Sequence, residues 1–448
     1  MFNKILVANR GEIAIRVMRA ARELGVKTVA VYSDADKDAL HVRYADESYP
    51  IGPAQASLSY LHIPNLINAA VQTGAEAIHP GYGFLSENNH FAQVCETWGL
   101  VFIGPPAEAI KQMGIKADAR NMMREAGVPV VPGTEGTVTD LHQAMRVAEE
   151  IGYPILVKAS SGGGGRGIRI VEQPDALGEA IERASREARS AFGQGDVYLE
   201  KFLHNPRHIE IQVMADKFGR VVTLGERESS LQRRRQKVLE ESPSVALTPE
   251  LRAAMSEAAV RAARAVSYTS AGTLEFLLDE AGHFYFMEMN TRVQVEHACT
   301  EMVTGFDIVK EQIRVAAGLP LSIAQEEVRL FGWAIECRIN AEDPDNQFRP
   351  SPGAVTVWQE AGGPGVRVDT GAETGTVVQP FYDSLLAKLV TWGRTREESI
   401  ARMRRALAEF RVEGVKTTID MHKQLMEDPE FNAGRIHINF LAERFKGA

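Results

Sequence analysis

Apolar and polar positions along the first hundred residues follow the pattern of a parallel α/β domain. Lys4 to Ala8 and Lys27 to Ser33 are short apolar runs, and between them Glu12 to Leu24 repeats apolar residues at helical spacing. Ala75 to His79 and Val101 to Ile103 predict two further strands. A strand–helix–strand opening predicts a parallel sheet, and open sheets of this kind bind ligands at the carboxyl ends of their strands.

A run of glycines lies between two predicted strands in the middle of the chain. Tyr153 to Lys158 and Ile168 to Val171 have the composition of strands, and Gly162 to Gly165 stand between them. Glycine amides are free to approach anionic oxygens, so the run favours a loop that folds over phosphates, with a flexible linker as the alternative. The run is not the helix-opening P-loop, because no lysine followed by serine or threonine begins a helix after it.

Further strands carry polar side chains. Asp196 to Phe202 predicts a strand that ends with Glu200 and Lys201, where backbone groups are able to read the edge of an adenine. Clean alternation over Arg207 to Met214 places three polar side chains on one face, namely His208, Glu210 and Gln212. The next segment, Glu226 to Lys237, is rich in arginine and predicts either a solvated basic loop or a clamp for phosphate.

The richest chemistry lies in Phe284 to His297, which follows a predicted strand over Thr273 to Leu278. A hairpin centred between Ala281 and Gly282 would place Glu275 opposite Glu288, and two such carboxylates repel unless a cation lies between them. Period two puts Asn290 on the face of Glu288, and carboxylate and amide oxygens suit Mg²⁺ or Mn²⁺. If the strand continues, one face also carries a cation, an amide and a possible base for a small oxyanion, namely Arg292, Gln294 and Glu296.

The remaining chain predicts helices, separated by short strands and turns. Pro249 to Val266, Gly305 to Ala317 and Arg396 to Phe410 have amphipathic spacing. A strand over Trp333 to Ile339 carries Arg338. Proline- and glycine-rich turns separate the short strands that follow it.

Composition bounds the class of protein. The 448 residues provide for roughly two to four domains, and 44% hydrophobic with 24% charged residues is ordinary for a soluble globular protein. A net charge of −9 argues against nucleic acid as a partner, and no apolar run is long enough for a membrane span. Three cysteines without CxxC spacing, and a charged N-terminus without a signal peptide, predict a cytoplasmic protein.

Four strings, read together, resemble the biotin carboxylase family of the ATP-grasp superfamily: HPGYGFLSEN, KASSGGGGRG, FMEMNTRVQVEH and ECRINAEDP. The likeness runs from about residue 2 to residue 445. It implies a multidomain α/β and α+β fold. The expected domains are an N-terminal parallel α/β domain over 1–114, a glycine-rich ATP-grasp lid over 115–203, and an ATP-grasp core with an antiparallel C-terminal domain over 204–448.

The resemblance implies a nucleotide site and a metal site. The matching residues for ATP are Lys116, Lys158, Gly162, Gly163, Gly164, Gly165, Glu200, Lys201, Leu203, His208, Gln232, Glu275 and Glu288. For two Mg²⁺ or Mn²⁺ ions they are Glu275 and Glu288, with Asn290 beside them. Labile carboxyphosphate, the implied intermediate, gives a closing glycine lid a purpose.

The resemblance also implies a bicarbonate site and a biotin site. Arg292, Gln294 and the backbone of Val295 match the bicarbonate pocket, and Glu296 matches the general base. The biotin site matches Tyr82 and Arg338, of which Arg338 stabilises the biotin enolate. Lys237 matches a lysine over the reacting phosphate and bicarbonate, so the implied catalytic set is Glu296, Arg292, Arg338 and Lys237.

The implied reaction carboxylates biotin on a separate carrier protein, with a separate carboxyltransferase and a homodimeric enzyme. The final acceptor, whether acetyl-CoA for fatty acid synthesis, propionyl-CoA, pyruvate or another, is chosen outside this chain. An ATP-grasp ligase with an acyl-phosphate intermediate and an amine acceptor is the alternative, and a nucleotide-binding regulator is a third. Arg235, Ala298 and Asn439 depart from the family pattern, which has histidine, proline and histidine there.

Overall fold

The computed structural model describes residues 1–134, 136–138, 140–159, 168–192 and 195–445. The chain folds into two compact units. The first comprises residues 1–114, 207–275 and 289–448, and the second comprises 115–206 with 276–288. The glycine loop expected at Gly162 to Gly165 lies outside the described residues.

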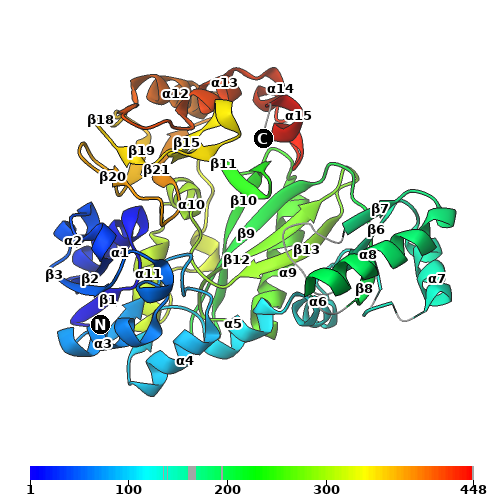
Figure 1. Ribbon diagram of the computed structural model, residues 1–448, viewed down its shortest axis with the longest axis horizontal. Helices are drawn as coiled ribbons and strands as arrows, with labels where there is room; N and C mark the ends of the chain where they lie inside the picture. Colours follow the sequence, from blue (N-terminus) through cyan, green and yellow to red (C-terminus); the bar gives the residue numbers. More distant parts are fainter. Residues whose placement is uncertain (135, 139, 160–167, 193–194, 446–448) are drawn as a thin grey trace. The chain divides into compact units, whose positions relative to one another are not determined.

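A five-stranded parallel sheet opens the first unit (Figure 1), as the strand–helix–strand pattern predicts. Its strand order is β3-β2-β1-β4-β5. The strands are β1 (Lys4–Val7), β2 (Lys27–Ser33), β3 (Glu47–Gly52), β4 (Ala77–His79) and β5 (Val101–Phe102). The helices are α1 (Gly11–Glu23), α2 (Leu40–Tyr44), α3 (Ile63–Thr73), α4 (Asn89–Thr97) and α5 (Ala107–Gly114). Apolar residues of α3 and α4 pack on one face of the sheet and those of α1 on the other.

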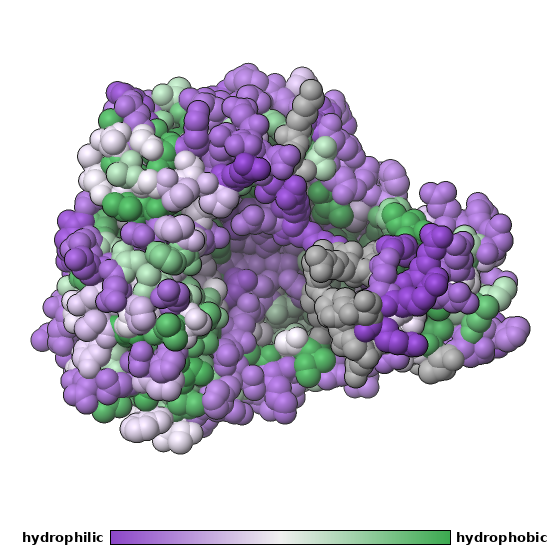
Figure 2. All heavy atoms as spheres, viewed as in Figure 1, coloured by the Kyte–Doolittle hydropathy of each residue, from purple (hydrophilic) through white to green (hydrophobic). Residues whose placement is uncertain are grey.

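The larger sheet has eight strands in the order β13-β12-β9-β10-β11-β14-β21-β19. Its strands are β9 (Arg207–Ala215), β10 (Val221–Arg233), β11 (Gln236–Ser242), β12 (Ser270–Leu278), β13 (Phe284–Asn290), β14 (Trp333–Asn340), β19 (Val366–Thr370) and β21 (Leu385–Gly393). The register of its pairs from β9 to β19 is antiparallel. In the space-filling view, hydrophilic side chains gather in the middle of the face on which this sheet lies (Figure 2).

Helices and short strands complete the first unit. The helices are α9 (Pro249–Ala265), α10 (His297–Thr304), α11 (Ile308–Ala316), α12 (Arg396–Glu409), α13 (Ile419–Glu427), α14 (Pro429–Asn432) and α15 (Phe440–Arg444). The short strands are β15 (Glu342–Asp343), β16 (Arg349–Pro350), β17 (Gly353–Ala354), β18 (Val357–Gln359), β20 (Val377–Val378) and β22 (Arg411–Glu413). Apolar residues of α12 to α15 cover one face of β11, β14 and β21, and apolar residues of α10 pack against part of the other face.

The second unit is small and has its own apolar core. A three-stranded antiparallel sheet in the order β7-β6-β8 packs with helices α7 and α8. Its elements are α6 (Lys116–Glu125), α7 (Leu141–Ile151), β6 (Ile155–Ala159), β7 (Ile168–Val171), α8 (Leu177–Phe192) and β8 (Val197–Lys201). The strands expected on either side of the glycine run are therefore confirmed.

The arginine-rich segment is not a loop, which corrects one of the two alternatives that we left open for it. Strand β10 continues to Arg233, and β11 begins at Gln236. Arg234 and Arg235 alone form the turn, both with positive φ angles of 47° and 69°. Charged residues in β10 are buried and neutralised by partners, so a polar sequence forms an interior strand; an example is Arg227. Turns of this hand match the twist of the strands they join.

The hairpin between β12 and β13 differs from the expected one in two ways. The Gly282 amide donates to the Asp279 carbonyl at 3.1 Å and the Asp279 amide to the His283 carbonyl at 2.9 Å, which centres the turn on Ala281. The turn is therefore centred half a residue earlier than expected, while the Asn290 amide still reaches Glu275 at 2.8 Å. Strand β13 also ends at Asn290, so residues 291–296 are not a continuing strand but a connection into α10.

Candidate active site

Lys237 lies at the centre of a cluster of buried carboxylates on the polar face of the large sheet. Its ammonium donates to Glu210 at 2.5 Å, to Glu275 at 2.7 Å and to Glu296 at 2.6 Å. These acceptors come from β9, β12 and the connection before α10. Burial alone would lower the pKa of Lys237, but the three carboxylates outweigh it and raise that pKa. The structure thus holds a permanent cation where the sequence predicted one.

Arg338 bridges two carboxylates next to this cluster. Its Nε donates to Glu240 at 2.8 Å, and its Nη2 donates to Glu240 and to Glu296, the latter at 2.9 Å. Burial raises the pKa of Glu240 to about 7, because the attraction of Arg338 offsets it only in part and Glu296 repels the charge. Burial acts on Glu296 in the same direction, yet Lys237, Arg338 and Arg227 together lower its pKa well below the usual range. Glu296 is therefore ionised and held by two cations.

The connection between β13 and α10 supplies a cation and two amides. Arg292 donates to Glu87 through Nε at 2.8 Å and to the Asn290 side-chain oxygen through Nη2 at 2.9 Å. The amide groups of Asn290 and Gln294 each donate to Glu275 at 2.8 Å. Although the strand ends at Asn290, the two amides still meet at the Glu275 carboxylate, and Arg292 joins them through Asn290. The expected grouping is preserved by a folded connection rather than by strand alternation.

Arg227 contacts Glu210 and Gln294 of this cluster and was not foreseen as a site residue. It donates to Glu210 at 2.6 Å, to Gln212 and Thr300 at 2.8 Å each, and to Gln294 at 2.6 Å. Its side chain is fully buried. Arg227 lies in an arginine-rich segment, two residues after a glycine, and such a sequence is typical of a loop. Only the pairing of β10 with β9 shows that Arg227 belongs to the site. Glu87 was likewise not foreseen as a site residue and entered the sequence analysis only within the string HPGYGFLSEN.

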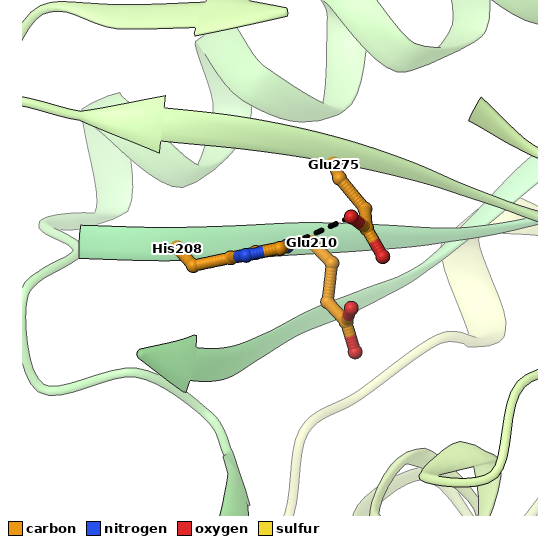
Figure 3. Close-up of side chains that lie close together, drawn as sticks. All are labelled: His208, Glu210 and Glu275. Atoms are coloured by element: carbon orange, nitrogen blue, oxygen red, sulfur yellow. Dashed lines mark ion pairs between the residues drawn. The ribbon is translucent and has the colours of Figure 1, made fainter. Parts of the chain in front are cut away.

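His208 and Glu275 are in contact on the same face, with Nε2 and Oε2 separated by 3.1 Å. His208, Glu210 and Glu275 point toward one another from β9 and β12 (Figure 3), and one ligand atom of each lies within 4.8 Å of the others. Gln232 approaches the other ring nitrogen of His208 at 2.7 Å. Mg²⁺ and Mn²⁺ prefer carboxylate oxygens as ligands, so the carboxylate oxygens of Glu275 suit a divalent cation.

The expected metal and nucleotide residues fall in both units. Glu275 and Asn290 lie in the first unit and Glu288 in the second. In the second unit, Lys158 pairs with Glu200, and Arg120 donates to the same carboxylate at 2.9 Å. Lys201 donates to the Gly152 carbonyl at 2.8 Å. The other two expected residues of this unit are placed by their elements, Lys116 at the start of α6 and Leu203 after β8.

Tyr82 lies in the loop after β4, and its hydroxyl donates to Glu12 of α1. Burial and the neighbouring carboxylate of Glu12 raise the pKa of Tyr82 well above its usual value. The loop itself is fixed by Asn9, whose amide donates to the carbonyls of Pro80 and Tyr82, each at 2.7 Å. A neutral, oriented phenol is a group that suits the wall of a site for an uncharged ring.

The three residues that depart from the family pattern occupy ordinary positions. Arg235 is exposed in the turn between β10 and β11. Ala298 is fully buried near the start of α10. Unlike the proline of the family pattern it has a backbone N–H, and it is compatible with the helix. Asn439 directly precedes α15.

Family models match nearly the whole chain in three consecutive segments. Residues 1–110 match the biotin carboxylase N-terminal domain, 116–324 the carbamoyl-phosphate synthase L chain ATP-binding domain, and 336–443 the biotin carboxylase C-terminal domain. Biotin carboxylase 1 of Bacillus subtilis is 54% identical over 98% of this chain and 98% of its own length. The 2-oxoglutarate carboxylase small subunit of Hydrogenobacter thermophilus is 52% identical over 99% of this chain and 94% of its own length.

Solved structures give the same result. A biotin carboxylase–β,γ-ATP complex from Campylobacter jejuni has a TM-score of 0.92 at 48% identity and covers 99% of both chains. The biotin carboxylase domain of a thermophilic 2-oxoglutarate carboxylase, bound to bicarbonate, has a TM-score of 0.95 at 50% identity and covers 99% of this chain and 98% of its own.

The fold is that of an ATP-grasp ligase. The chain belongs to the biotin carboxylase family. Our predictions of the family, of the fold class and of an ATP-dependent ligase are thereby confirmed. Relatives include subunits of multi-subunit carboxylases. Within the described part of the chain, each helix is too short or too polar to cross a membrane.

Proposed function

We propose that this chain catalyses the first half-reaction of a biotin-dependent carboxylase. ATP, bicarbonate and carrier-bound biotin give ADP, phosphate and carboxybiotin. The observation that carries the proposal is the position of Glu296, an ionised carboxylate between Lys237 at 2.6 Å and Arg338 at 2.9 Å. The two cations keep Glu296 deprotonated, so it is free to accept a proton, and their positive charge favours the binding of an oxyanion next to it.

The first step joins bicarbonate to the terminal phosphoryl group. Glu296 accepts the bicarbonate proton, a bicarbonate oxygen bonds to phosphorus, and the bond from phosphorus to ADP breaks. Arg292, Gln294 and the backbone of Val295 would hold bicarbonate, and Lys237 would neutralise charge that develops on the phosphoryl oxygens. Glu275 and Glu288, with Asn290 beside them, would hold Mg²⁺ or Mn²⁺. The metal supplies further neutralisation of phosphate charge.

The second step carboxylates biotin. Carboxyphosphate breaks down to CO₂ and phosphate, the phosphate takes the proton of the biotin ureido nitrogen, and that nitrogen bonds to the carbon of CO₂. Arg338 would stabilise the negative oxygen of the biotin enolate, with Tyr82 at the wall of the biotin site. The Glu240 carboxylate, which accepts from Arg338 at 2.8 Å, would keep the guanidinium in place.

Nucleotide binding is assigned to residues of both units. Lys116, Lys158, Glu200, Lys201 and Leu203 would contact ATP from segment 115–203, which we propose acts as the lid. From the large sheet, His208 and Gln232 would contact the nucleotide. The glycines Gly162 to Gly165 would cover its phosphates.

The proposed partners follow from the same chemistry. A biotin carboxyl carrier protein and a separate carboxyltransferase would complete the enzyme, and the active form would be a homodimer. Relatives named as subunits of pyruvate and 2-oxoglutarate carboxylases support a keto acid as the final acceptor. The three described cysteines are free and buried, which suits the reducing cytoplasm.

The test is ATP hydrolysis by the purified chain with Mg²⁺, measured with and without bicarbonate and then with added free biotin. Turnover that requires bicarbonate and rises with biotin is the expected result. Hydrolysis that is indifferent to both, or that requires an amine acceptor, would rule out the proposed half-reaction.

A further inference from the structure

A buried lysine outside the proposed catalytic set holds the backbone of the bicarbonate turn. Lys388 lies in the middle of β21, and its side chain is fully buried. Its ammonium donates to the carbonyl oxygen of Val295 at 2.9 Å. Two carboxylates compensate its charge, Glu12 at 3.4 Å and Asp369 at 3.5 Å. Burial of an ammonium group costs free energy unless anions pair with it. The two carboxylates keep Lys388 charged, and a charged ammonium is a strong donor to the Val295 carbonyl.

A histidine fixes the preceding peptide group of the same turn. The Nδ1 atom of His297 lies 2.7 Å from the carbonyl oxygen of Gln294. A carbonyl only accepts, so Nδ1 carries the proton and donates. Burial lowers the pKa of His297 to about 3, which keeps the ring neutral and preserves that tautomer. The Gln294 carbonyl and the Val295 amide belong to one planar peptide group, so the bond from His297 sets where that N–H points.

The two contacts act on the two peptide groups that flank Val295. His297 orients the group that contains the Val295 amide, and Lys388 orients the group that joins Val295 to Glu296. Because a peptide group is rigid, its dihedral freedom is removed once its carbonyl is held. His297 and Lys388 therefore orient the proposed bicarbonate donor, which is the Val295 amide, and the proposed base, which is Glu296.

Glu12 extends this arrangement to Tyr82. One oxygen of Glu12 accepts the Tyr82 hydroxyl, and the other is the oxygen that faces Lys388. The Lys388-facing oxygen is buried, and the ammonium is the cation beside it. A single carboxylate thus joins the bicarbonate turn to the wall of the proposed biotin site.

We propose that Lys388 and His297 are positioning residues that aim Val295 and Glu296, and that Glu12 couples this turn to Tyr82. This inference rests on the proposed function for its kinetic consequences. Its structural content, that these side chains hold residues 294–296 in place, does not depend on any activity.

The main variant is Lys388→Met, which keeps the length of the side chain and removes the donor. We expect the KM for bicarbonate to rise at least tenfold, biotin to lose its stimulation of ATP turnover, and the Kd of an ATP analogue to stay within twofold. Lys388→Arg should recover part of the bicarbonate KM. Lys310→Met is the matched control, because its ammonium also pairs with two carboxylates, those of Glu23 and Asp307. It should leave all three values unchanged.

Hydrogen exchange of the peptide that covers residues 291–299 tests the positioning role directly. We expect faster exchange in Lys388→Met than in the wild type and in Lys310→Met. Equal exchange, or a bicarbonate KM within twofold of wild type, would overturn the inference. If the wild type shows no bicarbonate-dependent turnover, the proposed function fails, while the exchange result still decides the positioning role.

Two further variants cover a failure of Lys388→Met to fold, because that substitution removes the cation beside the buried carboxylate of Glu12. Asp369 keeps its pairing with Arg367 at 2.7 Å. The double variant Lys388→Met with Glu12→Gln removes one cation and one anion together, and should show the same faster exchange. His297→Leu removes the other donor without changing the charge of the site. Unchanged exchange and an unchanged bicarbonate KM in His297→Leu would contradict the inference independently of Lys388.

Discussion

The charged side chains of the two units are held in different ways. In the first unit, Lys237 contacts three buried carboxylates and Arg227 contacts Glu210 together with several amide and hydroxyl groups. In the second unit, Lys158 contacts Glu200 and keeps a quarter of its side chain exposed. The groups assigned to bicarbonate and biotin are therefore oriented before any substrate binds, whereas Lys158 has far fewer restraints. Such preorganisation lowers the cost of reorganising dipoles during the reaction.

Glu296→Gln should have the largest effect on activity, because it removes the proposed base from the cluster. The amide cannot accept the bicarbonate proton, and Lys237 and Arg338 each lose a charged partner. We expect carboxybiotin formation to fall by about 10³-fold or more, a size typical for loss of a group that acts in the transition state. The measurement is ¹⁴C-bicarbonate incorporation into free biotin, with circular dichroism to show that the variant is folded. Wild-type incorporation would remove Glu296 from the mechanism.

Arg338→Lys tests whether the forked geometry of the guanidinium matters as well as its charge. The wild-type residue reaches Glu240 through two nitrogens and Glu296 through one of them. A lysine keeps the charge but loses the fork, so we expect kcat to fall by roughly 10- to 100-fold. Biotin-stimulated ATP turnover is the assay. A variant as active as wild type would show that charge alone suffices.

Lys158→Met tests the second unit and should have a smaller effect. With few partners to lose, the substitution should leave the fold intact and raise the KM for ATP by about tenfold, in line with the loss of one phosphate contact. The KM for bicarbonate should stay constant. A parallel rise in both KM values would show that the two sets of residues are more closely linked than their contacts indicate.

The pH dependence of stability sharpens the comparison within the first unit. The pKa of Glu240 is raised to about 7, so between its ordinary value of 4.5 and 7 the folded state binds the proton more tightly than the unfolded state. The free energy of unfolding therefore decreases as pH rises through this window. Glu240→Gln removes this contribution, which amounts to at most about 3 kcal/mol. Urea unfolding at pH 5, 6 and 8 measures it, and identical slopes in both proteins would contradict the assignment.

Much of the fold was accessible from periodicity because each element buries one face. Strands β2 and β7 have the predicted bounds, and α1 is shifted by only one residue at each end. The middle of strand β10 was not predicted as a strand, because it carries Glu226, Arg227 and Glu228, residues that normally indicate a loop. Burial of these charges depends on partners from other strands, which a local pattern does not contain.

The sequence predicted the kinds of side chain at the candidate site better than it predicted their arrangement. The run of residue types from Glu288 to Glu296 indicated a cation, an amide and a base, and the alternation suggested a strand. The backbone instead turns after Asn290, because the connection must lead into α10. Lys388 and Glu12 were not identified, since they lie more than 300 residues apart and meet only through the packing of β21 against α1.

The three hydrogen bonds of Lys237 have a consequence for the order of events. An ammonium has three N–H donors, and here Glu210, Glu275 and Glu296 occupy all of them. An incoming anion can bind this lysine only by displacing one of the carboxylates. A divalent ion that binds Glu275 would take that carboxylate and leave one donor vacant. With a divalent ion held by Glu275, Lys237 would exchange that carboxylate for the phosphate or bicarbonate that follows.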